Sequence, residues 1–157
     1  MTKQAAKEGQ IHLVVEDAGW RAHRGLLPRL TAAAQAARKA GKLPAKSGLT
    51  ILLADDARLK ALNHGFRGKR KPTNVLSFPS GVAGYAGDIA LAYGITRAEA
   101  LKGGKTFADH AAHLVVHGVL HLAGYDHMTD KDAGVMEPLE TKILARLGIS
   151  DPYGTSI

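Results

Sequence analysis

The chain has 157 residues and a formal charge of +7, because 21 lysines and arginines outnumber 14 acidic residues. It contains no cysteine, which excludes disulfides and thiolate metal ligands, and no apolar run approaches the roughly 20 residues that span a bilayer. The polar first ten residues lack the apolar stretch of a signal peptide. We expect one cytoplasmic domain over residues 1–157, with no membrane association, and a polyanion such as nucleic acid as its partner.

The first half of the chain favours strands that alternate with helices. Residues 11–16 read as a short strand, and the alanine-rich stretch 28–40 reads as a helix that Gly41 ends. The continuous apolar run 49–54 is typical of a strand buried on both faces. Asp55 or Asp56 then caps a helix that is expected to reach about Asn63.

The second half adds two strands and three helices. Strands are predicted at 75–78 and 88–92, with the glycine-rich stretch between them as a mobile loop or hairpin connection. A short helix over 96–101 precedes a long helix that Thr106 caps and that runs to about Leu122. Asp130 is expected to cap a last helix that runs to Leu147. Pro138 either kinks this helix or shifts its start. This order predicts a single-domain α/β fold, with a small mixed sheet packed against about five helices.

The most informative motif lies at the end of the long helix. His117 and His121 are four residues apart, so their side chains lie on one face, about 5–6 Å apart at Cβ. Gly124 is placed to end the helix, so that His127 supplies a third nitrogen from outside it. Three imidazoles and one open position are the usual ligand set of a catalytic zinc. We therefore predict that His117, His121 and His127 bind one Zn2+ ion.

The residue after the first histidine separates two chemistries. In the metzincin proteases, which share this histidine spacing, a general-base glutamate stands where this chain has Gly118. Phosphodiester cleavage expels an alkoxide that a metal or a cation stabilises directly, so it needs no such base. Gly118 is also expected to leave room beside the ion for a wide substrate. The motif favours phosphodiester over peptide hydrolysis.

A basic, glycine-containing loop forms the second candidate feature. Residues 63–74 hold four cations within positions 67–71, and such a loop brings guanidinium groups and backbone N–H groups to phosphate oxygens. Arg67 follows the apolar Phe66, which is expected to anchor it. We predict that Arg67 points at the metal and holds a phosphate.

The remaining histidines and acids have weaker roles. His110 and His113 lie on the same helix and are assigned to packing or to contacts behind the ligands. A histidine that binds a metal usually needs a partner on its other ring nitrogen. Asp126 and Glu137 are the candidates for that partner.

Together these segments resemble the YbeY family of bacterial rRNA maturation factors, over about residues 49–148. The motifs that carry the resemblance are His117-Gly118-x-Leu120-His121-Leu122-x-Gly124-Tyr125-Asp126-His127, Phe66-Arg67, Pro72-Thr73-x-Val75-Leu76-Ser77-Phe78, Gly87-Asp88-Ile89 and Met136-Glu137-Pro138-Leu139-Glu140. The chain departs from the family pattern at Phe66, Arg70 and Asn74, where tyrosine, an acidic residue and aspartate are usual.

The resemblance implies an endoribonuclease with one zinc, specific for single-stranded RNA. It further implies small-subunit (16S) rRNA 3′-end maturation and ribosome quality control, with rRNA and the ribosome as partners and no DNA. In that comparison His117, His121 and His127 match the zinc ligands, and Arg67 matches an arginine in the cleft that matters for activity. Two alternatives stay open: an RNA-binding ribosome-assembly factor whose zinc is mainly structural, and a zinc peptidase-like hydrolase.

Overall fold

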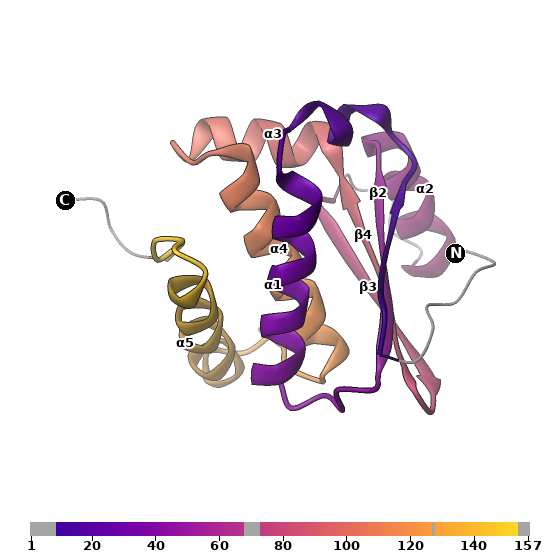
Figure 1. Cartoon of the computed structure of the whole chain (residues 1–157), viewed down its shortest axis with the longest axis vertical. Helices are drawn as coiled ribbons and strands as arrows, with labels where there is room; N and C mark the ends of the chain where they lie inside the picture. Colours follow the sequence, from indigo (N-terminus) through magenta and orange to yellow (C-terminus); the bar gives the residue numbers. More distant parts are fainter. Residues whose placement is uncertain (1–8, 68–72, 127, 154–157) are drawn as a thin grey trace.

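The computed structural model describes residues 9–67, 73–126 and 128–153. Four strands form one sheet in the order β1-β2-β4-β3 (Figure 1). Strands β1 and β2 are parallel, as are β2 and β4, whereas β3 runs antiparallel to β4. The predicted mixed sheet is confirmed, and its strands are β1 (Ile11–Val15), β2 (Gly48–Ala54), β3 (Val75–Val82) and β4 (Tyr85–Ala92).

Five α-helices lie within the described residues, as the sequence predicts. A 3-10 turn at Ala18–Ala22, which the sequence analysis missed, precedes the first of them. The second helix runs past the expected end at Asn63, and the third begins directly where β4 ends. The helices are α1 (Leu26–Ala40), α2 (Asp56–Arg67), α3 (Tyr93–Lys102), α4 (Phe107–Leu122) and α5 (Asp130–Arg146).

The helices cover the two faces of the sheet unequally. Figure 1 shows α1 and α4 beside one face and α5 outside them, and the larger hydrophobic core fills this side. A smaller core joins Leu52 and Ala54 of β2 to Leu59 and Leu62 of α2 on the opposite face. All seven positions of β2 are buried, which confirms the strand predicted to be covered on both faces.

The helix caps agree with the sequence except at α5. The Asp55 carboxylate accepts a hydrogen bond from the Arg58 backbone N–H at 2.8 Å and caps α2. At α5 the cap is Thr129, whose hydroxyl accepts from the Asp132 N–H at 3.1 Å, so the prediction of Asp130 is wrong by one residue. Asp130 instead lies in the first turn, where the helix dipole favours an acid.

The glycine-rich stretch between β3 and β4 is a hairpin rather than a mobile loop. Strand β3 continues through Pro79 to Val82, and the irregular register between these two residues marks the bend. Gly81 and Gly84 adopt φ values of 69° and 83°, a conformation that glycine reaches without strain. The strands are therefore longer than the sequence analysis predicted.

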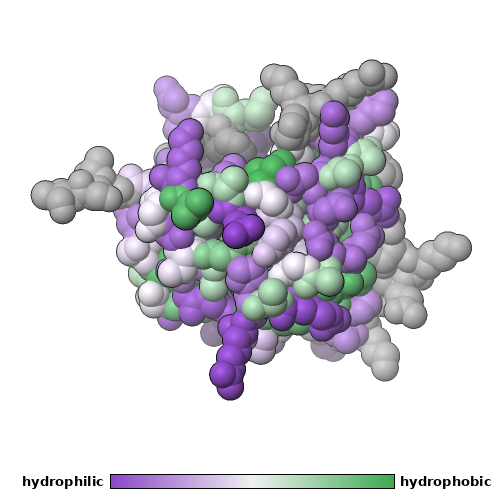
Figure 2. All heavy atoms as spheres, turned by 90° about the horizontal axis from the view of Figure 1, so that it is seen from above, coloured by the Kyte–Doolittle hydropathy of each residue, from purple (hydrophilic) through white to green (hydrophobic). Residues whose placement is uncertain are grey.

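The surface is mainly polar on the face that Figure 2 shows. Figure 2 shows the end of the molecule near α3, where hydrophilic side chains predominate and hydrophobic ones form small separate patches. Within the described ranges, none of the helices has the length and apolar character needed to traverse a bilayer.

Candidate metal centre

Helix α4 positions the first two histidines. The Thr106 hydroxyl accepts from the Asp109 N–H at 3.1 Å and starts the helix, as predicted. Gly124 follows the last turn with φ 98°, and the Tyr125 N–H reaches back to the Leu120 carbonyl at 3.0 Å. This is the pattern of a glycine-terminated helix. The helix therefore ends at Leu122, one residue after His121.

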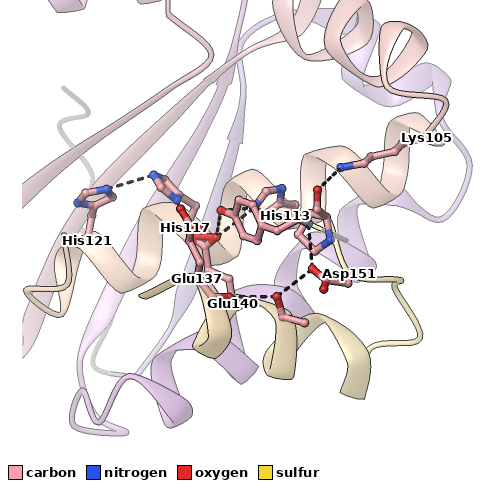
Figure 3. A network of polar contacts seen from close by, with 10 residues as sticks. Lys105, His113, His117, His121, Glu137, Glu140 and Asp151 are labelled. Carbon is pink, nitrogen blue, oxygen red and sulfur yellow. Dashed lines mark hydrogen bonds and ion pairs between the residues drawn. The ribbon is translucent and has the colours of Figure 1, made fainter. Parts of the chain in front are cut away.

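The two histidines face each other at the end of this helix (Figure 3). Their Nε2 atoms are 3.1 Å apart, and their ring centroids are 4.6 Å apart at an angle of 68°. Two nitrogens that each bind a tetrahedral zinc at about 2.0–2.1 Å stand roughly 3.3 Å apart. The observed separation therefore matches two neighbouring positions of one tetrahedral ion.

The third predicted ligand, His127, lies outside the described residues. The chain on both sides of it can be followed, because Asp126 and Met128 line the same cleft as His117 and His121. Within the described part of the chain, no three histidine, aspartate or glutamate side chains group to hold a metal ion.

A cleft of about 460 Å³ opens beside the two histidines. Helix α4 supplies one wall, and the start of β3 with the residues before it supplies the opposite wall. Polar groups line much of this space, which suits a polar substrate better than an apolar one. The lining residues are Thr73, Asn74, Val75, Ser77, His117, His121, Asp126 and Met128.

A buried carboxylate on α5 holds His117 from behind. Glu140 is fully buried, and its Oε1 lies 2.6 Å from His117 Nδ1. Its Oε2 accepts from the Tyr153 hydroxyl and lies 3.1 Å from His113 Nε2. Burial raises the pKa of Glu140, but the hydrogen bonds from His113, His117 and Tyr153 outweigh it and lower the pKa to about 2. The carboxylate is therefore ionised at neutral pH.

This partner differs from the two that the sequence analysis named. Glu140, which the sequence analysis did not name, contacts the second ring nitrogen of His117. A signal was present in α5, because Met136, Glu140, Ile143 and Leu144 follow helical spacing and all are buried. A carboxylate within such an apolar stripe needs a partner, which here is a pair of histidines.

Gly118 does not leave room for substrate, contrary to the prediction. It is buried against the sheet, and a Cβ atom at this position would lie 2.9 Å from Ile89 Cγ2 and 3.3 Å from Ser77 Oγ. The Ser77 hydroxyl also donates to the Gly118 carbonyl at 3.0 Å. The glycine allows α4 to approach β3 and β4 closely, and a glutamate there would have to displace Ile89.

The other polar side chains of α4 contact neighbouring helices. His113 contacts Glu140, and His110 lies 2.9 Å from Glu99 of α3. Burial lowers the pKa of His110, although Glu99 acts in the opposite direction. The Asn74 amide donates to Glu99 at 3.0 Å, so the residue that departs from the family pattern is matched to a carboxylate in this chain.

The predicted phosphate-binding residues are only partly placed. Arg67 is the last residue of α2, and the placement of its side chain lies outside the described residues, as do residues 68–72. Thr73, the next described residue, lines the cleft.

Comparison with known proteins identifies the family. The sequence model described as "Endoribonuclease YbeY" matches residues 22–148. Proteins named "Endoribonuclease YbeY" from Chelativorans sp. and Azorhizobium caulinodans are 52% and 46% identical, over 83% and 92% of this chain and 82% and 96% of their own lengths. One from Methylocella silvestris is 54% identical over 71% of this chain and 66% of its own length.

A solved structure agrees with this assignment. The solution structure of a Thermotoga maritima protein is similar with a TM-score of 0.61 at 25% identity, and the match covers 93% of this chain and 100% of that one. The family match spans α1 to α5 and includes His117 and His121, Glu140 and the cleft between α4 and β3. The chain thus belongs to the endoribonuclease YbeY family.

Proposed function

We propose that this protein is a metal-dependent endoribonuclease that cleaves single-stranded RNA, with one zinc ion bound by His117, His121 and His127. Its proposed substrate is small-subunit (16S) rRNA near the 3′ end, and its proposed role is rRNA maturation and ribosome quality control in the cytoplasm. Support for cleavage of RNA comes from the relatives that carry the name endoribonuclease. The single-strand preference and the ribosomal role rest on the family resemblance.

The observation that carries the proposal is the pair of Nε2 atoms 3.1 Å apart at the wall of a polar cleft. The donor set fits a zinc ion on two grounds. The spacing matches two tetrahedral positions, and the Glu140 contact to His117 Nδ1 leaves the Nε2 lone pair directed toward His121. When bound, the metal would supply Lewis-acid activation at the scissile phosphate.

The residues of the chain have separate roles in this proposal. His117 and His121 hold the ion at the end of α4, and Arg67 binds the non-bridging phosphate oxygens and stabilises the charge that develops there. Lys69, Arg70 and Lys71 attract the RNA backbone electrostatically. Thr73 and Asn74, which follow this basic segment in the sequence, line the cleft and so link the segment to the site.

Peptide hydrolysis is less well supported than RNA cleavage. A zinc peptidase needs a general base, and the position that would hold it is Gly118, which packs against Ile89 and Ser77. The side chain at this position points into the sheet contact, so a glutamate there would meet Ile89 before any substrate. The structure therefore favours the chemistry that needs no such base.

The test is cleavage of matched RNA substrates by the zinc-loaded full chain. We expect cleavage of a single-stranded oligonucleotide that carries the 3′ region of 16S rRNA, and much slower cleavage of the same sequence in a duplex. His117→Ala and Arg67→Ala should lose activity while they retain the circular dichroism spectrum of the parent. Arg24→Ala, which alters an exposed arginine outside the cleft lining, is the matched control.

Two results would overturn the proposal. Cleavage by His117→Ala at the parental rate would show that the nuclease activity is a contaminant. RNA binding without cleavage, together with unfolding on metal removal, would favour the assembly factor with a structural zinc.

A further inference from the structure

Glu140 lies at the centre of a hydrogen-bond network that joins three parts of the chain (Figure 3). It belongs to α5, and it contacts two histidines of α4 and a tyrosine beyond the end of α5. Its side chain has no solvent exposure, so these contacts replace the water that a carboxylate otherwise requires. A buried charge with three partners is costly to assemble, which indicates a role beyond packing.

The network selects the protonation pattern of His117. An ionised carboxylate only accepts hydrogen bonds, so the 2.6 Å contact requires a proton on His117 Nδ1. The neutral imidazole then carries its lone pair on Nε2, which is the atom that faces His121. Without the carboxylate, nothing in this contact would favour that tautomer over the other.

We propose that Glu140 is a positioning residue for the metal centre, which fixes the tautomer and ring orientation of His117, and that Tyr153 holds Glu140 in place. This inference rests on the proposed function, because it takes His117 as a metal ligand. The carboxylate raises the basicity of the ligand through the imidazole ring, as such pairs do in zinc sites generally. Tyr153 links the segment after α5 to the site.

The segment that carries Tyr153 is itself anchored. The Asp151 carboxylate accepts from the Thr141 hydroxyl at 3.1 Å and from the Tyr153 N–H at 2.8 Å. These bonds fix the turn that brings the tyrosine ring to His113, where the ring centroids are 5.5 Å apart. The last described residues therefore complete the surroundings of Glu140.

A second histidine–glutamate pair on the same helix provides an internal control. His110 Nε2 lies 2.9 Å from Glu99, but His110 is outside the predicted ligand set and its partner lies on α3. Glu99→Gln removes the same charge from a similar contact. It should leave the metal affinity unchanged if only the Glu140 contact serves the site.

The experiment measures zinc affinity by competition with a chromophoric chelator, for the parent, Glu140→Gln, Tyr153→Phe and Glu99→Gln. Glutamine keeps the shape of the side chain and can still accept from His117, so the fold should persist. We expect Glu140→Gln to weaken zinc binding about 10–100-fold, Tyr153→Phe to weaken it by no more than about tenfold, and Glu99→Gln to have no effect. Thermal unfolding of the metal-free proteins shows whether stability changes as well.

Nitrogen-15 NMR of the imidazoles provides the readout that a purely structural role would not move. In the metal-free parent, His117 should be protonated at Nδ1, whereas Glu140→Gln should give a mixture of tautomers. Unchanged zinc affinity and an unchanged His117 tautomer in Glu140→Gln would overturn the inference. In that case His121→Ala still tests the proposed function, because its loss of zinc binding would show that the site exists without a role for Glu140.

Discussion

Gly118→Ala tests the packing that places α4 on the sheet. The added Cβ would lie 2.9 Å from Ile89 Cγ2, 3.2 Å from Ile89 Cδ1 and 3.3 Å from Ser77 Oγ. Ile89 is fully buried, so its side chain has little space into which it can move. Gly134 in α5 is the matched control, because it is also helical but exposed, and a Cβ there meets nothing within 4 Å.

Both substitutions gain the higher helix propensity of alanine, but only Gly118→Ala overpacks the core. Replacement of a helical glycine by alanine stabilises by about 1 kcal/mol. Overpacking of a dense core costs about 1–3 kcal/mol, so Gly118→Ala should be neutral to destabilising by roughly 2 kcal/mol. Gly134→Ala should stabilise by about 1 kcal/mol. For a chain of this length, the difference corresponds to about 2–12 °C in Tm between the variants.

The assay is thermal unfolding of the metal-free proteins, followed by circular dichroism at one protein concentration. We expect Gly134→Ala to unfold above the parent and Gly118→Ala at or below it. If Gly118→Ala unfolds as high as Gly134→Ala, the close contact between α4 and the sheet is not a constraint. The steric argument against a catalytic glutamate at this position would then fail.

Three further predictions concern the metal, the RNA and the contact between Asn74 and Glu99. Zinc at 100 times its Kd should stabilise the protein by about 2.7 kcal/mol and so raise its Tm. Zinc should not raise the Tm of His121→Ala. Replacement of the cations at 69–71 by alanine should reduce the slope of log Kd against log salt for single-stranded RNA by about 2. An unchanged slope would show that these three residues do not contact the RNA. Asn74→Asp should destabilise at pH 7, because it sets a second carboxylate beside Glu99 and so raises the pKa of the pair in the folded state. Protonation of either carboxylate relieves the repulsion. The loss of unfolding free energy relative to the parent, measured by urea unfolding, should therefore shrink as the pH falls towards 4. A loss that does not change with pH would contradict the reasoning.

Local signals in the sequence predicted most of the elements. The apolar run of β2 and the Thr106 cap of α4 depend on residues close together in the chain, and both were confirmed. The extent of the hairpin was missed because Gly81 interrupts the sequence pattern, whereas the pairing resumes beyond it between Val82 and Tyr85. Glycine marks a bend, but it does not show whether strand pairing continues beyond it.

Long-range packing decided what the sequence could not show. Glu140 meets His117 because α5 packs on α4, and the helical spacing that marks Glu140 as a buried position does not show which residue it meets. Gly118 likewise suggested open space, whereas the register of α4 on the sheet directs that position towards Ile89. The histidine pair was predictable because both residues lie on one helix, within a single turn.

Zinc K-edge X-ray absorption of the full chain, loaded with one equivalent of zinc, tests the central claim most directly. We predict three imidazole nitrogens at about 2.0–2.1 Å and the loss of one of them in His127→Ala. Failure to retain zinc, or a spectrum that His127→Ala leaves unchanged, would contradict the three-histidine centre.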